Sequence, residues 1–329
     1  MIVTQVFRKK DPAFFSIERV FSAVDGELGK KVELRMISVP RYGISLRNIF
    51  AVTPFFNRAG KTDVYHITGH IHYLVFAYPP HRTLLTIHDC VFLNQAKGWR
   101  RLVLKKLLLD WPVRRAALVT AISEASRQEI LKHTHCSPDK IVVISNPVNE
   151  AISYTPGDPD PKEPVILFVG ATPNKNLLRV IPALEGIPAQ LHIVGQIPET
   201  GLQLLLEHRI QYRQSLHLSD QELANCYRDA DLVLFPSTYE GFGLPILEAQ
   251  KAGRPVITSD LAPMNEVAGG AACLVDPYSI DSIRAGILQV TRDRRYREEL
   301  VKKGLENVKR YDKKAIAEAY LACYQKLVK

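Results

Sequence analysis

The sequence predicts an α/β protein with two domains, each built on a parallel β-sheet covered by helices. Short apolar runs of strand length alternate with longer helical segments along the whole chain, and this alternation is typical of parallel sheets. A stretch with five prolines, Asn146–Pro164, separates two such series and has the composition of a linker. The chain has 329 residues, 46% of them hydrophobic and 23% charged, which suits a globular protein with two cores.

The first half of the chain, residues 1–150, is expected to form one domain. Its segments follow in this order: strand 1–7, helix 11–24, strands 32–39, 63–69 and 83–89, a long helix 97–117, strand 117–123, a helix opened by Ser123, and strand 141–146. In parallel sheets, ligands bind at the carboxyl ends of the strands. Here those ends carry His66, Gly69, His88, Asp89, Ser123 and Asn146.

Residues 151–311 are expected to form the second domain by the same alternation. The order is strand 165–170, a helix from Asn174, strand 190–195, a helix from about Gly201, helix 218–230, strand 231–237, helix 245–253, strands 255–260 and 273–276, and then helices to the C-terminus. The last of these helices, in residues 312–329, is expected to be a separate segment.

Segment lengths and composition argue against a membrane-spanning protein. No apolar run approaches the ~18 residues of a transmembrane helix. The charges in the start MIVTQVFRKKD follow a very short apolar stretch, which is the reverse of a signal peptide. Five cysteines are scattered without a disulfide or zinc spacing. We therefore expect a cytoplasmic protein with reduced cysteines.

Positive charge is concentrated in the first half of the chain. Residues 1–150 hold 22 lysines and arginines against 12 aspartates and glutamates, whereas residues 151–329 hold 21 against 22. A basic half can face nucleic acid, anionic lipid or a phosphorylated substrate. Because the sequence has none of the basic and aromatic motifs of RNA or DNA modules, we expect no nucleic-acid partner. Peripheral contact with the inner face of a membrane, or a phosphorylated acceptor, is favoured instead.

The stretch Asp231–Glu248, DLVLFPSTYEGFGLPILE, carries the strongest functional signal. Its pattern is a strand, a turn-rich loop and a helix with Pro245 at its first position. Amides at a helix start bind anions such as diphosphate. Glu240 in the loop and Glu248 one turn into the helix supply carboxylates, which accept hydrogen bonds from sugar hydroxyls. The spacing therefore predicts a ligand with phosphate between two hydroxyl-bearing groups, as in a nucleotide-sugar.

These residues resemble the retaining GT-B glycosyltransferases of family 4, through Glu240 and Glu248 with GFGLP between them and the following AGRPVITSDLAPMNEVAG (Ala252–Gly269). The resemblance implies two Rossmann-like domains facing across a cleft, with the last helix crossing back to the first domain. It also implies that Glu240 lies beside the donor sugar and that Glu248 holds the ribose. The backbone amides that would meet the sugar and the diphosphate belong to Gly241, Phe242, Gly243 and Leu244.

Lys175, in FVGATPNKNLL, is the expected cation of the donor site, with Asn174 beside it. It follows a strand and lies near a helix start, where a lysine suits the charge that grows on a leaving diphosphate. Members of the resembled family place a second basic residue shortly before or beside this lysine, whereas this chain has Ala171 and Asn174 there. Either another residue substitutes, Arg179 and Arg254 being the candidates, or the enzyme is weaker or inactive.

His88 and Asp89 end the strand TLLTIHD and mark the expected catalytic and acceptor side of the first domain. A histidine there can contact the donor sugar or the acceptor, with the neighbouring carboxylate orienting it, and the resembled family often has this pair. His66, His70 and His72 form a second cluster. Without cysteine or carboxylate partners at ligand spacing, this cluster does not indicate a metal site. We expect His70 on the acceptor side.

Asp229 and Asp231 mimic the Asp-x-Asp motif of metal-dependent glycosyltransferases, but they precede a strand, the wrong end for catalysis in a parallel sheet. We expect a structural role for them, with the helix start and Lys175 in place of a metal ion. No cofactor is then needed beyond the nucleotide-diphosphate sugar, which is the substrate. Glu240 as a nucleophile and a same-face mechanism both remain open. We assign Glu240 only a sugar contact and an electrostatic share in catalysis.

Two further basic segments lie in the first half. Where the resembled family has a glycine pair after the first strand, this chain has RKKDPAFF, and Arg8, Lys9 and Lys10 are expected to face a phosphorylated or lipid-phosphate acceptor. Trp99–Trp111, WRRLVLKKLLLDW, combines aromatic ends with basic pairs, as membrane-surface helices do. Its apolar residues also go most of the way round the helix, as in buried helices. Both interpretations stay open.

Together these features predict a metal-independent, retaining hexosyltransferase. It would move a sugar from a nucleotide-diphosphate donor to an acceptor hydroxyl on a glycan or lipid-linked acceptor, in bacterial-type polysaccharide or lipid-linked glycan assembly. One alternative is a nucleotide-sugar epimerase of GT-B fold. The other is a degenerate sugar-nucleotide-binding scaffold, suggested by the missing basic partner of Lys175. A nicotinamide-dependent oxidoreductase is disfavoured because no glycine-rich dinucleotide fingerprint follows a first strand.

Overall fold

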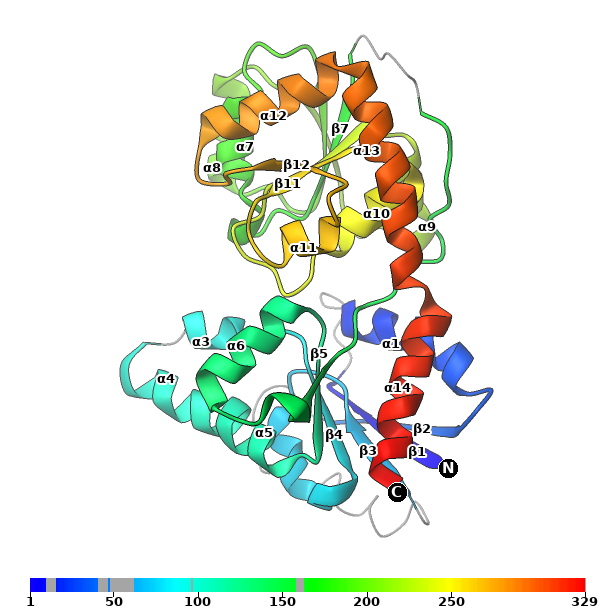
Figure 1. Cartoon of the computed structure of the whole chain (residues 1–329). Coiled ribbons are helices and arrows are strands. Elements are labelled where there is room, and N and C mark those ends of the chain that lie inside the picture. The colour runs from blue at the N-terminus through cyan, green and yellow to red at the C-terminus, as the bar shows by residue number, and fades with distance from the viewer. Residues whose placement is uncertain (10–15, 41–46, 48–61, 96, 158–162, 329) are drawn as a thin grey trace. The chain divides into compact units, whose positions relative to one another are not determined.

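The computed structural model of the protein describes residues 1–9, 16–40, 47, 62–95, 97–157 and 163–328. The chain divides into two compact units (Figure 1): Met1–Pro147 with Asp312–Lys329 form unit 1, and Val148–Tyr311 form unit 2. The division falls inside the expected linker. Part of that linker packs on unit 2, since the amide of Thr155 donates to the carbonyl of Ala252 over 3.3 Å. Among the described residues, no helix combines the length and the apolar character needed to cross a membrane.

Unit 1 is built on a six-stranded parallel sheet in the order β2-β1-β3-β4-β5-β6. Its strands are β1 (Ile2–Phe7), β2 (Glu33–Ser38), β3 (Val64–Ile67), β4 (Thr83–Ile87), β5 (Leu118–Ala121) and β6 (Ile141–Val143). All six were predicted. The strand order reverses between β1 and β3, and the carboxyl edge at such a switch point is where open α/β sheets bind ligands.

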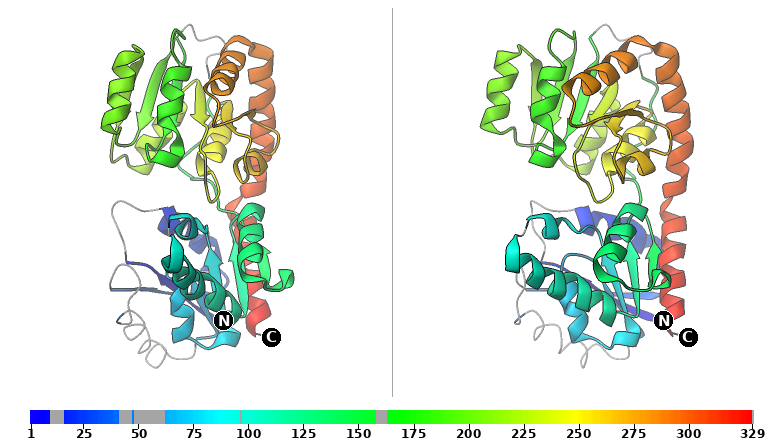
Figure 2. Two further views of the ribbon diagram at one scale, coloured as in Figure 1. Left: turned by 90° about the vertical axis from the view of Figure 1, so that its left-hand side faces the viewer. Right: turned by 60° about the vertical axis from the view of Figure 1, so that its left-hand side comes forward.

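Helices cover both faces of this sheet (Figures 1 and 2). On one face α1 (Ser16–Leu28) packs against α14 (Lys313–Val328), and Phe21, Tyr320 and Tyr324 are fully buried there. The last helix is therefore part of the first unit, as the resemblance implied. The other face carries a continuous helix made of α4 (Gly98–Lys105), a π-helical turn (Lys106–Asp110) and α5 (Trp111–Arg115), together with α6 (Glu124–Thr134).

Short elements complete unit 1. They are the five-residue helix α3 (Val91–Gln95) and the 3₁₀ turns His72–Ala77, Pro80–Arg82 and Pro138–Lys140. The sequence did not predict them, because segments of one or two turns do not develop a helical period. Ser123 caps α6 as expected, since its hydroxyl accepts a hydrogen bond from the amide of Ser126 over 3.1 Å.

Unit 2 has a second six-stranded parallel sheet, in the order β12-β11-β10-β7-β8-β9. Its strands are β7 (Val165–Val169), β8 (Gln190–Val194), β9 (Gln211–Ser215), β10 (Leu232–Phe235), β11 (Val256–Ser259) and β12 (Cys273–Val275). Counted within the unit, this is the Rossmann order 3-2-1-4-5-6, with its switch point between β7 and β10. We did not predict β9, an edge strand whose residues QYRQS are mostly exposed and lack an apolar signal.

The helices of unit 2 lie on both faces of its sheet (Figure 2). They are α7 (Leu177–Ala183), α8 (Glu199–Glu207), α9 (Asp220–Arg228), α10 (Leu244–Ala252), α11 (Met264–Ala268), α12 (Ile280–Arg292) and α13 (Arg294–Asn307). A 3₁₀ turn (Pro173–Lys175) precedes α7, so the helix expected from Asn174 begins three residues later. A second 3₁₀ turn, Val308–Tyr311, ends the unit.

Candidate active site

The loops that follow β7 and β10 meet at the switch point of unit 2. The carbonyl of Asn174 accepts a hydrogen bond from the amide of Thr238 over 2.8 Å, and the side-chain amide of Asn174 donates to the carbonyl of Tyr239 over 3.0 Å. Asn174 therefore ties the two loops together. This pairing brings the residues before α7 next to the loop that leads into α10.

Lys175 and Glu240 form an ion pair at this junction. The Nζ atom of Lys175 lies 2.6 Å from Oε1 of Glu240, and both side chains are largely shielded from solvent. The side-chain amide of Asn174 donates to the same oxygen over 3.3 Å. The amine also lies 4.6 Å from the ring centroid of Phe235. The lysine stem passes over Gly170, where a Cβ would come within 2.9 Å of Lys175 Cε. We expected the two charges to contact different parts of a ligand, and the structure pairs them directly.

The start of α10 lies directly after this loop. The helix begins at Leu244, with Pro245 at its second position instead of its first, so it opens one residue earlier than we predicted. Gly243 precedes it with φ +106°, and an added Cβ there would also crowd Ile246. The side chain of Phe242 is buried against the ring of Tyr311 at 5.8 Å, so only its backbone can serve a ligand. The first amides of a helix and the positive end of its dipole favour an anion.

Glu248 lies in the second turn of α10 and is almost fully buried, with 8% of its surface exposed. The hydroxyl of Tyr227, a buried residue of α9, donates to Glu248 Oε2 over 2.7 Å. Burial and the carboxylate raise the pKa of Tyr227 well above its usual value, so the hydroxyl keeps its proton. Sequence reasoning missed Tyr227, because its position in α9 reads as an ordinary core position of an amphipathic helix.

The two arginines considered as substitutes for the missing basic residue lie in different places. Arg179, an exposed residue of α7, donates to Asn176 Oδ1 over 2.9 Å and lies over the ring of Tyr278, near the loop that holds Lys175. Arg254 is buried just before β11, at the opposite edge of the sheet, and donates to the carbonyls of Tyr227 and Arg228. Arg254 is therefore excluded as a partner of Lys175.

The carboxyl edge of the unit 1 sheet holds His88 and Asp89. Nε2 of His88 donates to the carbonyl of Thr68 over 2.8 Å, which leaves Nδ1 as the acceptor nitrogen. Burial and the neighbouring His70 lower the pKa of His88 to about 4, so the ring is neutral at pH 7. Asp89 does not orient His88 as we expected. Its Oδ1 caps α3 by accepting from the amide of Val91 over 3.0 Å, and its Oδ2 lies 3.8 Å from Nε2 of His70.

The three histidines of the second cluster separate into one exposed and two core residues. His70 has 41% of its side chain exposed and faces Asp89. His66 is buried between the hydroxyls of Tyr324 and Thr86, at 2.8 and 2.7 Å, and burial lowers its pKa to about 3. His72 donates to the carbonyl of Leu108 over 2.6 Å, and burial lowers its pKa to about 4. The described residues contain no group of three or more His, Cys, Asp or Glu side chains suited to a metal.

Arg8 directly follows β1 at the same edge of unit 1. Its guanidinium makes a two-pronged ion pair with Glu18 of α1, at 3.0 and 3.1 Å, so it is not simply presented to an acceptor as we expected. Lys9 is exposed, whereas Lys10 falls outside the described residues. The charges of Arg8 and Glu18 both act on the pKa of His88, after burial, His70 and the backbone bond to Thr68.

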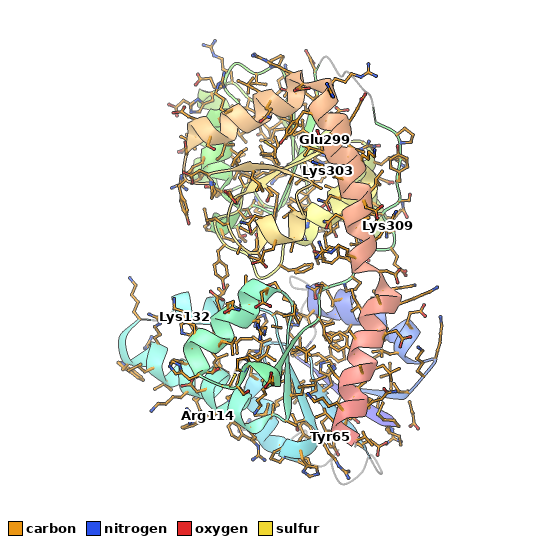
Figure 3. All side chains as sticks on the ribbon, in the orientation of Figure 1. Tyr65, Arg114, Lys132, Glu299, Lys303 and Lys309 are labelled. Atoms are coloured by element: carbon orange, nitrogen blue, oxygen red, sulfur yellow. The ribbon has the colours of Figure 1, made fainter. Side chains whose placement is uncertain are left out.

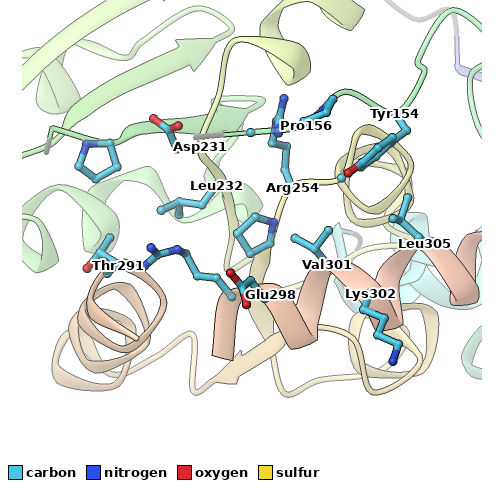
Figure 4. A pocket seen from close by; sticks show the side chains of 15 residues that line it. Tyr154, Pro156, Asp231, Leu232, Arg254, Thr291, Glu298, Val301, Lys302 and Leu305 are labelled. Atoms are coloured by element: carbon cyan, nitrogen blue, oxygen red, sulfur yellow. Dashed lines mark hydrogen bonds between the residues drawn. The ribbon is translucent and has the colours of Figure 1, made fainter. Parts of the chain in front are cut away.

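A separate pocket of about 380 Å³ lies at the amino edge of the unit 2 sheet (Figure 4). Tyr154, Asp231 and Arg254 line it, with α13 on one side. Asp231 Oδ2 accepts a hydrogen bond from the amide of Val165 over 2.8 Å, and Asp229 pairs with Arg228. Both carboxylates thus make structural contacts, away from the edge that carries Lys175 and Glu240.

Comparison with known proteins shows the family to which this chain is similar. A family model described as Glycosyl transferases group 1 matches residues 156–307, and one described as Glycosyltransferase Family 4 matches residues 12–151. The chain is 30% identical over 224 residues to O-antigen chain mannosyltransferase B of Escherichia coli, covering 60% of this chain and 57% of that protein. It is 27% identical over 251 residues to the serotype-specific mannosyltransferase WbdA of Escherichia coli, covering 67% of this chain and 30% of that protein.

The chain thus matches between 30% and 57% of the length of these two relatives. Among solved structures, HepE of Anabaena in complex with UDP and glucose matches with a TM-score of 0.79 at 16% identity, covering 98% of this chain and 99% of that chain. Two parallel-sheet units with this structural match define the GT-B fold. With both family models matched, the chain belongs to the GT-B glycosyltransferases of family 4. These models do not favour the epimerase alternative.

Proposed function

We propose that this protein is a retaining hexosyltransferase that moves a sugar from a nucleotide-diphosphate donor to an acceptor hydroxyl during polysaccharide or lipid-linked glycan assembly. The observation that carries the proposal is the convergence of Lys175, Glu240 and the start of α10 at the switch point of unit 2. The names of the two relatives, both mannosyltransferases, support mannose as the first sugar to test. The neighbour solved with UDP and glucose supports a nucleotide-linked donor.

In the proposed donor complex, the diphosphate lies at the amides that begin α10. Its charge competes with Glu240 for the Lys175 amine, which lies 2.6 Å from that carboxylate. Lys175 then stabilises the leaving diphosphate as the glycosidic bond breaks, and Glu240 turns to the hydroxyls of the sugar. Glu248, held by Tyr227, accepts hydrogen bonds from the ribose hydroxyls. A helix start and a lysine supply positive charge at this position, so no metal ion enters the proposal.

On the acceptor side, the proposal assigns His88 a positioning role. Its Nδ1 is the acceptor nitrogen of a ring that is neutral at pH 7, since its pKa lies at about 4. A group of that pKa accepts a hydrogen bond from a hydroxyl but is a poor general base near neutrality. The proton of the acceptor hydroxyl therefore goes to the leaving diphosphate, as in a same-face mechanism with retention.

The test is a transfer assay with a panel of donors, including GDP-mannose and UDP-glucose, and saccharide acceptors with and without a lipid anchor. We expect one donor to be consumed with transfer, the product to keep the anomeric configuration, and EDTA to leave the rate unchanged. Glu240→Gln should lower kcat by about 10²–10³-fold, while Glu298→Gln, an exposed carboxylate of α13 paired with Arg294, should not. Interconversion of free donor sugars would instead indicate the epimerase, and binding without turnover the scaffold.

A further inference from the structure

Helix α4 presents an apolar face to the outside of unit 1. Trp99, Leu102 and Val103 are 71%, 62% and 43% exposed, and no residue of α4 is buried. Their spacing of i, i+3 and i+4 places the three side chains on one face of the helix. In a globular domain such a face normally packs on the core, whereas here the described residues leave it open.

The second half of the same helix is firmly anchored. The chain continues from α4 through the π-helical turn into α5 without a break, and Leu109, Pro112 and Val113 of that second half are buried in the unit 1 core. Trp111 remains 47% exposed. The interpretation of this segment as a buried helix is therefore correct for its second half and wrong for its first.

The surroundings of the apolar face are strongly basic. Residues 97–115 contain seven lysines and arginines and one acidic residue, Asp110, which lies 4.0 Å from Lys105. Arg100, Arg101 and Lys106 are exposed. The neighbouring α6 adds Lys132, and Figure 3 labels Lys132 and Arg114 on this side of the unit. Burial and then the charges of Lys105, Lys132 and Arg101 lower the pKa of His133.

We propose that the α4 patch, defined as Trp99, Arg100, Arg101, Leu102, Val103 and Lys106, docks this protein on an anionic lipid bilayer. Apolar side chains with tryptophan enter the boundary between headgroups and acyl chains, and flanking basic residues bind lipid phosphates. A nucleic acid would pair with the charges but would leave the apolar face in water. The combination of both features favours lipid. Docking uses none of the residues of the donor site, so it stands or falls separately from the proposed transfer reaction.

The protein carries a built-in probe for this proposal, because its two tryptophans, Trp99 and Trp111, both belong to this helix. We expect vesicles containing phosphatidylglycerol to shift tryptophan emission to the blue and brominated acyl chains to quench it. Trp111→Phe leaves Trp99 as the single reporter. Vesicles of phosphatidylcholine alone should cause no shift, and 0.5 M NaCl should weaken the effect, because the basic side chains are solvated and screened.

Vesicle co-sedimentation of the full chain compares the patch with matched controls. The double variant R100E/R101E should lower partitioning onto phosphatidylglycerol vesicles at least tenfold. The double variant K303E/K309E changes the net charge equally but lies on unit 2 (Figure 3), at lysines paired with Glu299 and Glu306, and should bind as the wild type does. Leu102→Ser should weaken binding, whereas Leu206→Ser, at a 75% exposed leucine of α8, should not.

Three results would overturn the proposal. One is unchanged tryptophan emission with anionic vesicles. Another is equal loss of binding in the patch and control variants, which would mean that only net charge matters. The third is a lipid-free dimer that becomes monomeric in Leu102→Ser, which would assign the face to a second copy of the chain. The melting temperature of each variant, measured without lipid, checks that the variant is folded.

Discussion

The amine of Lys175 lies 2.6 Å from Oε1 of Glu240, with 18% and 14% of the two side chains exposed. In the structure the two groups neutralise each other just before the start of α10. Under the proposed function, a diphosphate bound at that helix start would take the lysine from the carboxylate, which would free the carboxylate for the sugar. The proposal therefore predicts that the pair couples recognition of the phosphate to contact with the sugar.

Replacing Lys175 with glutamine should remove charge stabilisation that develops as the diphosphate leaves. We expect kcat to fall by about 10²–10³-fold, with a smaller rise in KM for the donor, because the loss is larger in the transition state. Steady-state kinetics with the best donor measures both constants. Lys303→Gln, at an exposed lysine of α13 paired with Glu299, is the control. Equal kcat in the Lys175 variant and the wild type would contradict the assignment.

Replacing Arg179 or Arg254 with glutamine should affect different properties of the protein. Arg179→Gln should weaken binding of the nucleotide diphosphate about tenfold and leave the melting temperature unchanged, because the side chain is exposed beside the Lys175 loop. Arg254→Gln should lower stability by about 2–3 kcal/mol, since it unpairs buried carbonyls. Thermal unfolding with and without nucleotide separates the effects. If both variants only lower stability, the second cation of the site lies elsewhere.

Tyr227→Phe removes one hydrogen bond to the Glu248 carboxylate and little volume. A charge-assisted hydrogen bond of about 1.5 kcal/mol corresponds to about a tenfold rise in donor KM. We expect kcat to change less than twofold, since the ribose is held equally in the ground and transition states. Tyr212→Phe, at a partly exposed tyrosine of β9, is the matched control. A fall in stability without a change in KM would make the hydroxyl purely structural.

Asp25→Asn should stabilise the protein at pH 7.5. Burial raises the pKa of Asp25 from 3.8 to about 6, although Gln5 donates to Oδ1 over 2.7 Å. The folded state then binds a proton more tightly than the unfolded state, so stability falls as the pH rises through 6. Ionised at pH 7.5, Asp25 costs at most about 3 kcal/mol. Urea denaturation should show that Asp25→Asn raises the free energy of unfolding, by an amount that shrinks toward pH 4. Asp281→Asn, at an exposed carboxylate of α12, should give no comparable increase.

The buried histidines of unit 1 should make the fold sensitive to acid. The pKa values of His66, His72 and His88 fall from 6.5 to about 3, 4 and 4 by burial. The unfolded chain therefore binds more protons below pH 6.5, and stability present above that pH is lost as the pH falls toward 4. Each histidine contributes about 1.4 kcal/mol per pH unit. The free energy of unfolding of His88→Gln should fall less between pH 6.5 and 5 than that of the wild type. His81→Gln, at an exposed histidine, should follow the wild type.

Most of the fold was predictable from the sequence, because buried parallel strands are short apolar runs with clear boundaries. The elements missed lack a periodic apolar pattern, because β9 is an exposed polar edge strand and α3 and α11 are too short to show a helical period. The glycine-rich loop before Glu248 was also visible, because its conformation requires particular residues, as at Gly243 with φ +106°.

Individual contacts of the site were less predictable. A strand position fixes which edge a residue reaches but not which neighbour its side chain bonds. His66 therefore turned out to be a core residue bound to Tyr324, some 258 positions away in the chain, and Asp89 caps a helix instead of orienting His88. Tyr227 gave no signal, since a buried tyrosine that donates to a carboxylate looks in the sequence like any core aromatic residue.

The return of α14 to unit 1 has a consequence for how the protein is made. Tyr320 and Tyr324 complete the core beside Phe21, yet they follow the whole of unit 2 in the chain and are translated after it. Unit 2, which ends at Tyr311, has its whole sequence earlier. During translation unit 2 can thus reach its native state before unit 1. One face of the unit 1 sheet stays uncovered until α14 has been synthesised.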